Sequence, residues 1–215
     1  MTVRPALPDG LVEGGVVAID RRLDPERVTD IADGLLGGGV RSFELTLNEP
    51  QSAALASIEV VARHAAGTGL TVGAGTVLSI EAAQRAVDAG AAFLVMPHTD
   101  AALIAWAAER GIPAFPGAFT PTEVLSAWRA GATAVKLFPA SVAGPAFIRE
   151  FRGPFPDIPL VPTGGVTADT APAFITAGAI AVGLGSWLTG DGDATGIAER
   201  GARVVRAVAE ARAGR

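Results

Sequence analysis

The chain has 215 residues, of which 49% are hydrophobic, and a formal net charge of −5 at pH 7, so we expect a single domain over residues 1–215 with a sizeable core. The acidic balance argues against a nucleic-acid partner, and no apolar run approaches the ~20 residues of a membrane helix or resembles a secretory signal. With no cysteine and two histidines, the sequence offers neither a disulfide framework nor a multi-histidine metal site, which fits a cytoplasmic protein without a metal cofactor.

Short β-prone runs alternate along the chain with stretches of helical period. The runs lie at residues 16–19, 42–47, 70–76, 93–97, 113–118, 134–139, 160–165 and 181–186. The tail from Asp191 onward reads as the last helix. Repeated β-α units in a chain of this length predict an α/β fold, a (β/α)8 TIM barrel, with a doubly wound open sheet as the alternative.

Two of the helical stretches carry clear boundary signals. In the first, Val28, Ile31 and Leu35 fall on one face, and the glycines at residues 37–39 end the pattern. A later helix should begin at residues 120–123, where a threonine and a glutamate three residues apart form a capping box around a proline. These signals support the β-α alternation.

Lys136 is the only lysine among the 17 lysine and arginine residues of the chain. It lies between Val135 and Leu137 in the sixth predicted strand, where a cation is costly to bury. An arginine could form a salt bridge there, but only a lysine amine can lose its proton and attack a carbonyl. The sequence therefore favours a nucleophilic lysine over an ordinary one that is rare by composition.

Side chains alternate along two of the predicted strands. In residues 42–48 the polar Ser42, Glu44, Thr46 and Asn48 share one face, and the apolar residues between them must pack under the helices. The same logic points Ala134, Lys136 and Phe138 into the barrel. A carboxylate and an amine then share one enclosed space. The alternative is a buried ion pair with a purely structural role.

Glycines end the last two predicted strands. Residues 163–165 read Thr-Gly-Gly and residues 183–186 read Gly-Leu-Gly-Ser. In barrels the loops after strands seven and eight commonly hold phosphate on backbone amides, although each glycine pair alone could be a tight turn. Lysine, carboxylate and phosphate cradle together predict a Schiff-base enzyme acting on a phosphorylated keto compound, with no cofactor.

From about residue 16 to residue 188 the sequence resembles the class I 2-keto-3-deoxy-6-phosphogluconate (KDPG) aldolases and their relatives for 2-keto-3-deoxy-6-phosphogalactonate and 4-hydroxy-2-oxoglutarate. The motifs that carry the resemblance are FELTL at 43–47, VGAGTVL at 72–78, VKLFPA at 135–140, PTGGV at 162–166 and GSWL at 185–188. The resemblance implies a homotrimeric lyase that cleaves a phosphorylated 2-keto acid to pyruvate and an aldehyde.

The resemblance also implies roles for individual residues. Lys136 matches the Schiff-base lysine, Glu44 the general acid/base and Thr76 a threonine that holds the pyruvate portion. The matches to the phosphate cradle are Gly164, Gly165, Gly185 and Ser186. Arg21 aligns with a basic position facing the anionic end of the substrate, and Pro97 with the proline that ends the fourth strand. We expect Thr46, Asn48, Phe138 and Thr163 to complete the substrate contacts.

Two features depart from the family pattern. Asn48, followed by Glu49 and Pro50, resembles the phosphogalactonate branch, whereas Thr163 resembles the phosphogluconate branch, so the preferred C4 epimer stays open. His98 stands where the family usually has glycine or asparagine, and we expect an exposed loop histidine. The competing class of function is a phosphate-binding isomerase or binding protein that forms no covalent intermediate.

Overall fold

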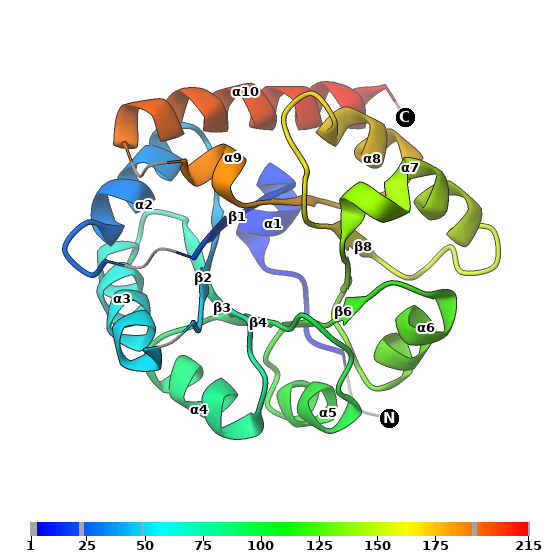
Figure 1. Ribbon diagram of the computed structural model, residues 1–215, viewed down its shortest axis with the longest axis horizontal. Helices are drawn as coiled ribbons and strands as arrows, with labels where there is room; N and C mark the ends of the chain where they lie inside the picture. The colour runs from blue at the N-terminus through cyan, green and yellow to red at the C-terminus, as the bar shows by residue number, and fades with distance from the viewer. Residues whose placement is uncertain (1–3, 22–23, 49, 191–192, 215) are drawn as a thin grey trace.

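Parallel strands form a ring surrounded by helices in the computed structural model (Figure 1), which describes residues 4–21, 24–48, 50–190 and 193–214. Glu49 and Asp191, named above, lie outside these ranges. The strands are β1 (Val16–Asp20), β2 (Ser42–Thr46), β3 (Thr71–Gly75), β4 (Phe93–Val95), β5 (Ala114–Phe115), β6 (Gly117–Ala118), β7 (Val135–Leu137), β8 (Leu160–Pro162) and β9 (Val182–Leu184). The helices are α1 (Asp9–Gly14), α2 (Val28–Gly37), α3 (Gln51–His64), α4 (Ile80–Asp88), α5 (Ala101–Glu109), α6 (Pro121–Arg129), α7 (Ala140–Phe151), α8 (Ala171–Ala177), α9 (Ser186–Thr189) and α10 (Ala194–Ala213).

The strands close into a barrel. One run is hydrogen-bonded in the order β5-β4-β3-β2-β1-β9 and a second in the order β6-β7-β8, with every pairing parallel. A parallel bridge between Thr163 and Gly183 joins β8 to β9. The structure confirms the predicted barrel and excludes the open doubly wound sheet, because β9 returns to β1.

The fifth predicted strand is split at Pro116 into β5 and β6. Proline has no amide hydrogen to donate to a strand ladder, so the pairing changes at that residue. The carbonyl oxygen of Pro116 still accepts a hydrogen bond from the amide of Lys136 at 2.9 Å. The two pieces therefore act as one barrel strand, with β5 against β4 and β6 against β7.

The predicted helix boundaries are largely as expected. Helix α2 runs to Gly37 with Val28, Ile31 and Leu35 buried. Helix α6 has the predicted capping box, in which Thr120 and Glu123 exchange hydrogen bonds around Pro121. Helix α1 was not predicted. Its Leu11 is buried against the barrel interior, so α1 covers the end of the barrel near the start of β2.

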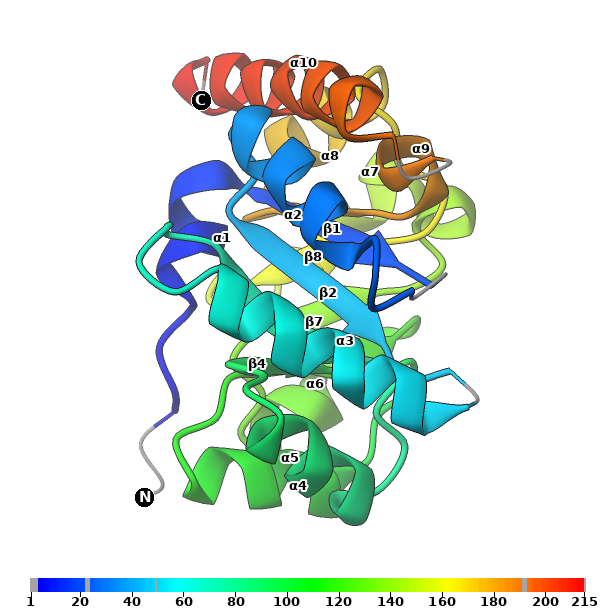
Figure 2. The ribbon, with the colours of Figure 1, turned by 90° about the vertical axis from the view of Figure 1, so that its left-hand side faces the viewer.

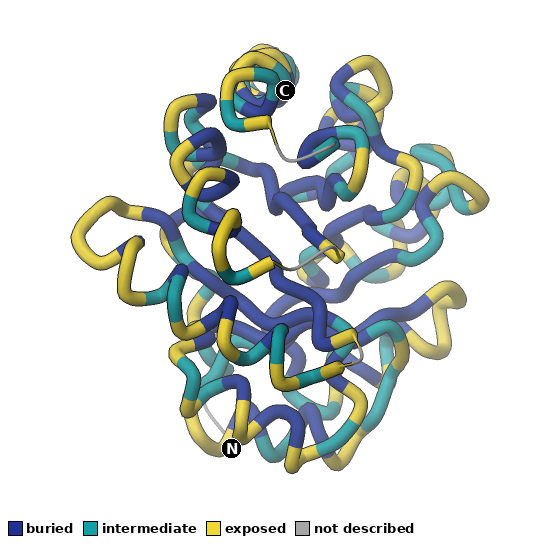
Figure 3. The backbone as a smooth tube through the Cα atoms, turned by 60° about the vertical axis from the view of Figure 1, so that its left-hand side comes forward, coloured by how far each residue is buried: buried dark blue, intermediate teal, exposed yellow. Residues whose placement is uncertain are grey.

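Two apolar layers flank the strands. Side chains from one face of each strand join the helix residues in a large outer cluster, which includes Phe43 and Leu45. The opposite faces meet inside the barrel in a smaller cluster of Leu11, Val17, Ile19, Phe93, Val95, Phe115, Ala134, Val161 and Ala181. Figure 3 shows the result: the strands are buried along their length, while the helices expose one side.

Arginines hold both ends of the described chain. Arg4 donates to the carbonyl oxygens of Ala132 at 2.6 Å and Trp128 at 2.7 Å, and its guanidinium lies 3.3 Å from the Trp128 ring centroid. Arg212 of α10 donates to carbonyl oxygens of Val12 at 2.9 Å and Ile180 at 2.6 Å. Figure 2 shows α10 lying along one side of the molecule. Among the described helices, none is both long and apolar enough to cross a membrane.

Candidate active site

Glu44 and Lys136 both lie inside the barrel. Their strand neighbours Phe43, Leu45 and Leu137 belong to the outer cluster, which leaves the opposite faces of β2 and β7 to the interior. Glu44 is 2% exposed and Lys136 is 8% exposed. The alternation therefore placed both side chains correctly, at the face where Ala134 also lies.

The two side chains are electrostatically coupled without forming a contact ion pair. Burial raises the pKa of the Glu44 carboxyl, and the nearby charges of Lys136 and then Arg21 partly oppose that rise. The ion pairs found among the described residues, with a 4.0 Å limit, include neither Glu44 nor Lys136. The predicted alternative, a buried structural ion pair, is therefore not formed within this limit by the described Glu44 and Lys136.

Strand β3 provides space and strain next to Glu44. A Cβ atom on Gly75 would overlap the Oε1 atom of Glu44, so only glycine leaves room for the carboxyl group. The next residue, Thr76, has a φ of 56°, a conformation that a β-branched residue rarely adopts. Strained backbone of this kind concentrates at functional sites.

Thr46 follows Glu44 on the inward face of β2. It is 2% exposed, and its Oγ1 atom has no hydrogen-bond partner among the described residues. In register, Thr46 pairs with Gly75, the residue that Glu44 covers. A buried hydroxyl without a partner is costly, so it is available to a substrate or reacting group at this position.

An apolar wall lies beside Lys136. Its Nζ atom is 5.2 Å from the ring centroid of Phe138, within the range of a cation–π contact. Phe138 and Pro97 line a cavity of about 380 Å³ together with His98 and Phe119. His98 is exposed at its rim, as expected for a loop histidine. Phe138 and Pro97 thus lie together on one side of the lysine.

A second cavity, of about 120 Å³, lies at the ends of β8 and β9. It is lined by Ile19, Arg21, Thr163, Gly164, Gly165, Val166, Thr167, Gly185, Ser186 and Trp187. Gly164 and Gly165 have φ values of 96° and 78°, which only glycine adopts readily. All four residues predicted for the phosphate cradle are therefore brought together.

Arg21 supplies the cationic side of this second cavity. A Cβ atom on Gly185 would lie 3.2 Å from its Nη1 atom, so the guanidinium rests against that glycine. The backbone of Arg21 is held at both ends, since its amide donates to Asp20 Oδ1 at 2.9 Å and its carbonyl oxygen accepts from Asn48 Nδ2 at 3.2 Å. Exposed Asn48 thus acts in this structure by holding Arg21.

Thr163 lines the smaller cavity. It is buried, its Oγ1 atom donates to the carbonyl oxygen of Val161 at 3.3 Å, and a Cβ atom on Gly183 would overlap its hydroxyl. Sequence reasoning missed Thr167 and Trp187 as cavity residues. The only available signal was their position one to two residues beyond the two glycine motifs.

A family model described as "KDPG and KHG aldolase" matches residues 9–199. The chain belongs to this family. A "probable 2-dehydro-3-deoxy-6-phosphogalactonate aldolase" of Rhizobium meliloti is 37% identical over 186 residues, 86% of each chain. The 2-dehydro-3-deoxy-phosphogluconate aldolase of Pseudomonas aeruginosa is 35% identical over 175 residues, 80% of this chain and 76% of the relative. The resemblance to this aldolase family is confirmed.

Solved structures agree with the barrel. A native KDPGal structure is 31% identical, covers 98% of both chains and has a TM-score of 0.85. A KDPG aldolase from Legionella pneumophila, with pyruvate captured as a covalent carbinolamine, is 25% identical, with a TM-score of 0.81 over 93% of this chain and 98% of that one. The predicted class of enzyme, an aldolase, is therefore confirmed at the level of the family.

Proposed function

We propose that the protein cleaves 2-keto-3-deoxy-6-phosphogluconate to pyruvate and glyceraldehyde 3-phosphate through a Schiff base on Lys136. One observation carries the proposal: the only lysine of the chain is buried inside the barrel, where its charge acts on the buried carboxyl of Glu44. The covalent carbinolamine in the Legionella relative supports the same class of chemistry.

The proposed reaction needs only this chain's own groups. The neutral amine of Lys136 adds to the C2 ketone, and loss of water leaves a protonated imine. Glu44 then takes the proton of the C4 hydroxyl as the C3–C4 bond breaks, and the bonding electrons move to the imine nitrogen. The aldehyde departs, the resulting enamine is protonated at C3, and water releases pyruvate.

The two cavities suggest how the substrate lies. We assign the phosphate to the cavity at Gly164, Gly165, Gly185 and Ser186, where Arg21 adds a charge-assisted donor. The pyruvate portion then lies at Lys136, with Thr46, Thr76, Pro97 and Phe138 around it. This assignment gives each predicted binding residue a place along one substrate, apart from Asn48, whose amide nitrogen bonds to the backbone of Arg21.

Reduction of enzyme with borohydride in the presence of pyruvate tests the proposal. An aldolase of this type should gain the mass of one reduced pyruvate adduct, located on the peptide that contains Lys136. A phosphate-binding isomerase or binding protein, the competing class, should bind phosphate esters but gain no adduct. Enzyme treated with borohydride in the absence of pyruvate is the control for unspecific reduction, and it should gain no adduct.

We expect Thr46→Val to separate stability from activity. Removing a buried hydroxyl without a partner should raise the free energy of unfolding by ~1 kcal/mol, while loss of its hydrogen bond to the reacting groups should lower kcat about tenfold. Urea unfolding and steady-state kinetics measure the two effects. Thr46→Ser, which keeps the hydroxyl, should retain most of the activity. A valine variant that is less stable and fully active would make the hydroxyl structural.

We expect relaxed discrimination between the gluconate and galactonate epimers. Asn48 stands where the phosphogluconate enzymes of the family carry an arginine, and its smaller side chain leaves room near C4. The Thr163 hydroxyl should favour the gluconate C4 hydroxyl by ~1 kcal/mol, about fivefold in kcat/KM. Kinetics of wild type and Thr163→Val with both epimers, and with 4-hydroxy-2-oxoglutarate, measure this preference. A galactonate preference above about tenfold, or an unchanged ratio in the variant, would contradict it.

We also propose that the protein acts as a cytoplasmic homotrimer. The absence of cysteine suits a reducing compartment. Large apolar side chains that remain exposed near the carboxyl ends of the strands, Leu78, Ile80, Phe119 and Val142, are candidates for the subunit contact. The molar mass in solution, measured by light scattering, tests the trimer.

A further inference from the structure

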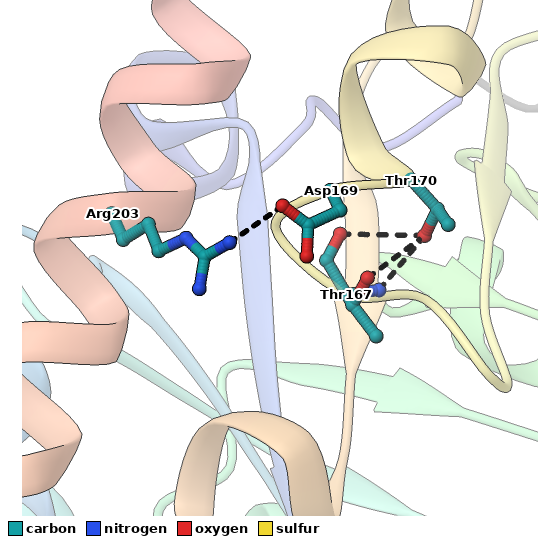
Figure 4. Close-up of polar contacts among 4 residues, drawn as sticks. All are labelled: Thr167, Asp169, Thr170 and Arg203. Atoms are coloured by element: carbon teal, nitrogen blue, oxygen red, sulfur yellow. Dashed lines mark hydrogen bonds and ion pairs between the residues drawn. The ribbon is translucent and has the colours of Figure 1, made fainter.

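One arginine of α10 contacts both loops that form the small cavity. Figure 4 shows Arg203 reaching from the helix toward the loop after β8, where its Nη2 atom lies 2.5 Å from Oδ1 of Asp169. The same guanidinium lies 6.0 Å from the ring centroid of Trp187, which follows β9. Trp187 itself lines the cavity. Arg203 therefore bridges the two sides of this cavity from behind.

Asp169 is rigidly connected to a cavity residue through a tight turn. The amide of Thr167 donates to Thr170 Oγ1 at 2.9 Å, and the amide of Thr170 donates to the carbonyl oxygen of Thr167 at 3.2 Å. Thr167 lines the cavity and Ala168 is buried. A force that holds Asp169 in place therefore also holds Thr167 in place.

The preceding residues are held at Gly164, whose carbonyl oxygen accepts a hydrogen bond from the amide of Ser141 at 3.0 Å, and at buried Val166. Gly164 and Gly165 adopt positive φ values, and glycine has wide backbone freedom on either side of such a conformation. By contrast, α10 is a 20-residue helix whose Val204 and Val208 are buried in the outer cluster. A second anchor for the loop, beyond the glycines, thus comes from a well-packed helix outside the cavity.

Resting on the function proposed above, we propose that Arg203 is a positioning residue that holds the two loops at the spacing required by the phosphate of the substrate. The side chains of Arg203 and Asp169 are 56% and 73% exposed. An exposed pair of this kind contributes little to folding. Its effect should therefore appear in binding of the phosphate end of the substrate.

Arg203→Gln and Asp169→Asn should each raise KM for the phosphorylated substrate by about two- to fivefold, the range expected for an exposed pair. The kcat value and the KM for unphosphorylated 4-hydroxy-2-oxoglutarate should stay unchanged. Arg203→Lys should retain most of the wild-type affinity. Combining the Gln and Asn substitutions should cost no more than either alone, because both break one interaction.

The sign of the Asp169→Asn effect separates positioning from long-range attraction. If Arg203 acted only as a positive charge near the phosphate, removing the neighbouring carboxylate would tighten binding, whereas loss of the anchor weakens it. Arg63→Gln, which breaks the exposed Arg63–Glu59 pair on α3, is the matched control and should change nothing. Tighter substrate binding in Asp169→Asn, or an unchanged KM in both Arg203→Gln and Asp169→Asn, would overturn the proposal.

Binding of inorganic phosphate, followed by calorimetry, provides a readout that does not depend on turnover. Both variants should weaken it by the same factor as they raise KM. Absence of lyase activity in the wild type would reject the proposed function and leave this measurement intact. If the wild type binds phosphate and neither variant changes that affinity, the role of Arg203 is rejected and the proposed function is unaffected.

Discussion

Lys136→Arg should abolish adduct formation with pyruvate and lower turnover by about 10⁴-fold or more, as expected when a covalent nucleophile is removed. Arginine keeps the positive charge beside Phe138 and Glu44, but its guanidinium stays protonated and forms no imine. Mass spectrometry after borohydride treatment checks the adduct, and steady-state kinetics check the rate. Because Lys136 is the only lysine, the assignment of an adduct to one side chain is simple.

Two controls accompany this variant. Circular dichroism and thermal unfolding should show that Lys136→Arg keeps the wild-type fold, since the chain retains a cation at a site that already accommodates one. Lys136→Met, which removes the charge, should be equally inactive. A reducible adduct in the arginine variant would show that another amine carries the reaction.

Glu44→Gln should slow turnover by about 10² to 10⁴-fold, the usual cost of losing a positioned acid/base. The amide occupies the same space above Gly75 but neither accepts nor releases a proton at neutral pH. The Lys136 adduct should still form, although more slowly. Single-turnover kinetics separate adduct formation from C3–C4 cleavage. An unchanged rate would reduce Glu44 to a neighbour of Lys136.

The same substitution should change how stability depends on pH. Burial raises the pKa of the Glu44 carboxyl above that of the same group in the unfolded chain, so the folded protein binds this proton more tightly than the unfolded chain does. Stability from the protonated carboxyl is therefore present below the unfolded pKa and lost as pH rises through the folded pKa. Glu44→Gln should remove that loss. Thermal unfolding of both proteins from pH 4 upward measures it, and parallel curves would contradict it.

Regular strands explain why much of the site could be predicted from the sequence. A period of two along residues 42–47 and 134–138 is enough to assign Glu44 and Lys136 to one enclosed space, because parallel strands in a barrel share a common interior. The glycine motifs were equally readable, since positive φ values at Gly164 and Gly165 demand glycine.

The loops were less predictable because their conformation depends on distant residues. Asn48, which stays a predicted substrate contact, donates from its amide nitrogen to the carbonyl oxygen of Arg21, 27 residues earlier in the chain. Thr167 belongs to a turn whose Asp169 pairs with Arg203, 34 residues further along the chain. Neither pairing leaves a local pattern in the sequence. Helix α1 was missed because it is short and stabilised by burial of Leu11 in the barrel end.

Three glycines beneath the site limit which of its positions can be substituted. Gly75 and Gly183 lie directly against Glu44 and Thr163, so a side chain at either would displace the group above it. A Cβ atom on Gly185 would lie 3.2 Å from Arg21 Nη1, so the guanidinium would have to shift slightly. The rim differs at Ser186, whose side chain is exposed and can be exchanged without that displacement, whereas exposed Asn48 holds the backbone of Arg21. Substitutions that change substrate preference are therefore tolerated at the rim of the site and not at the glycines beneath it. Two homologues of this barrel can accept different substrates while keeping the same glycines.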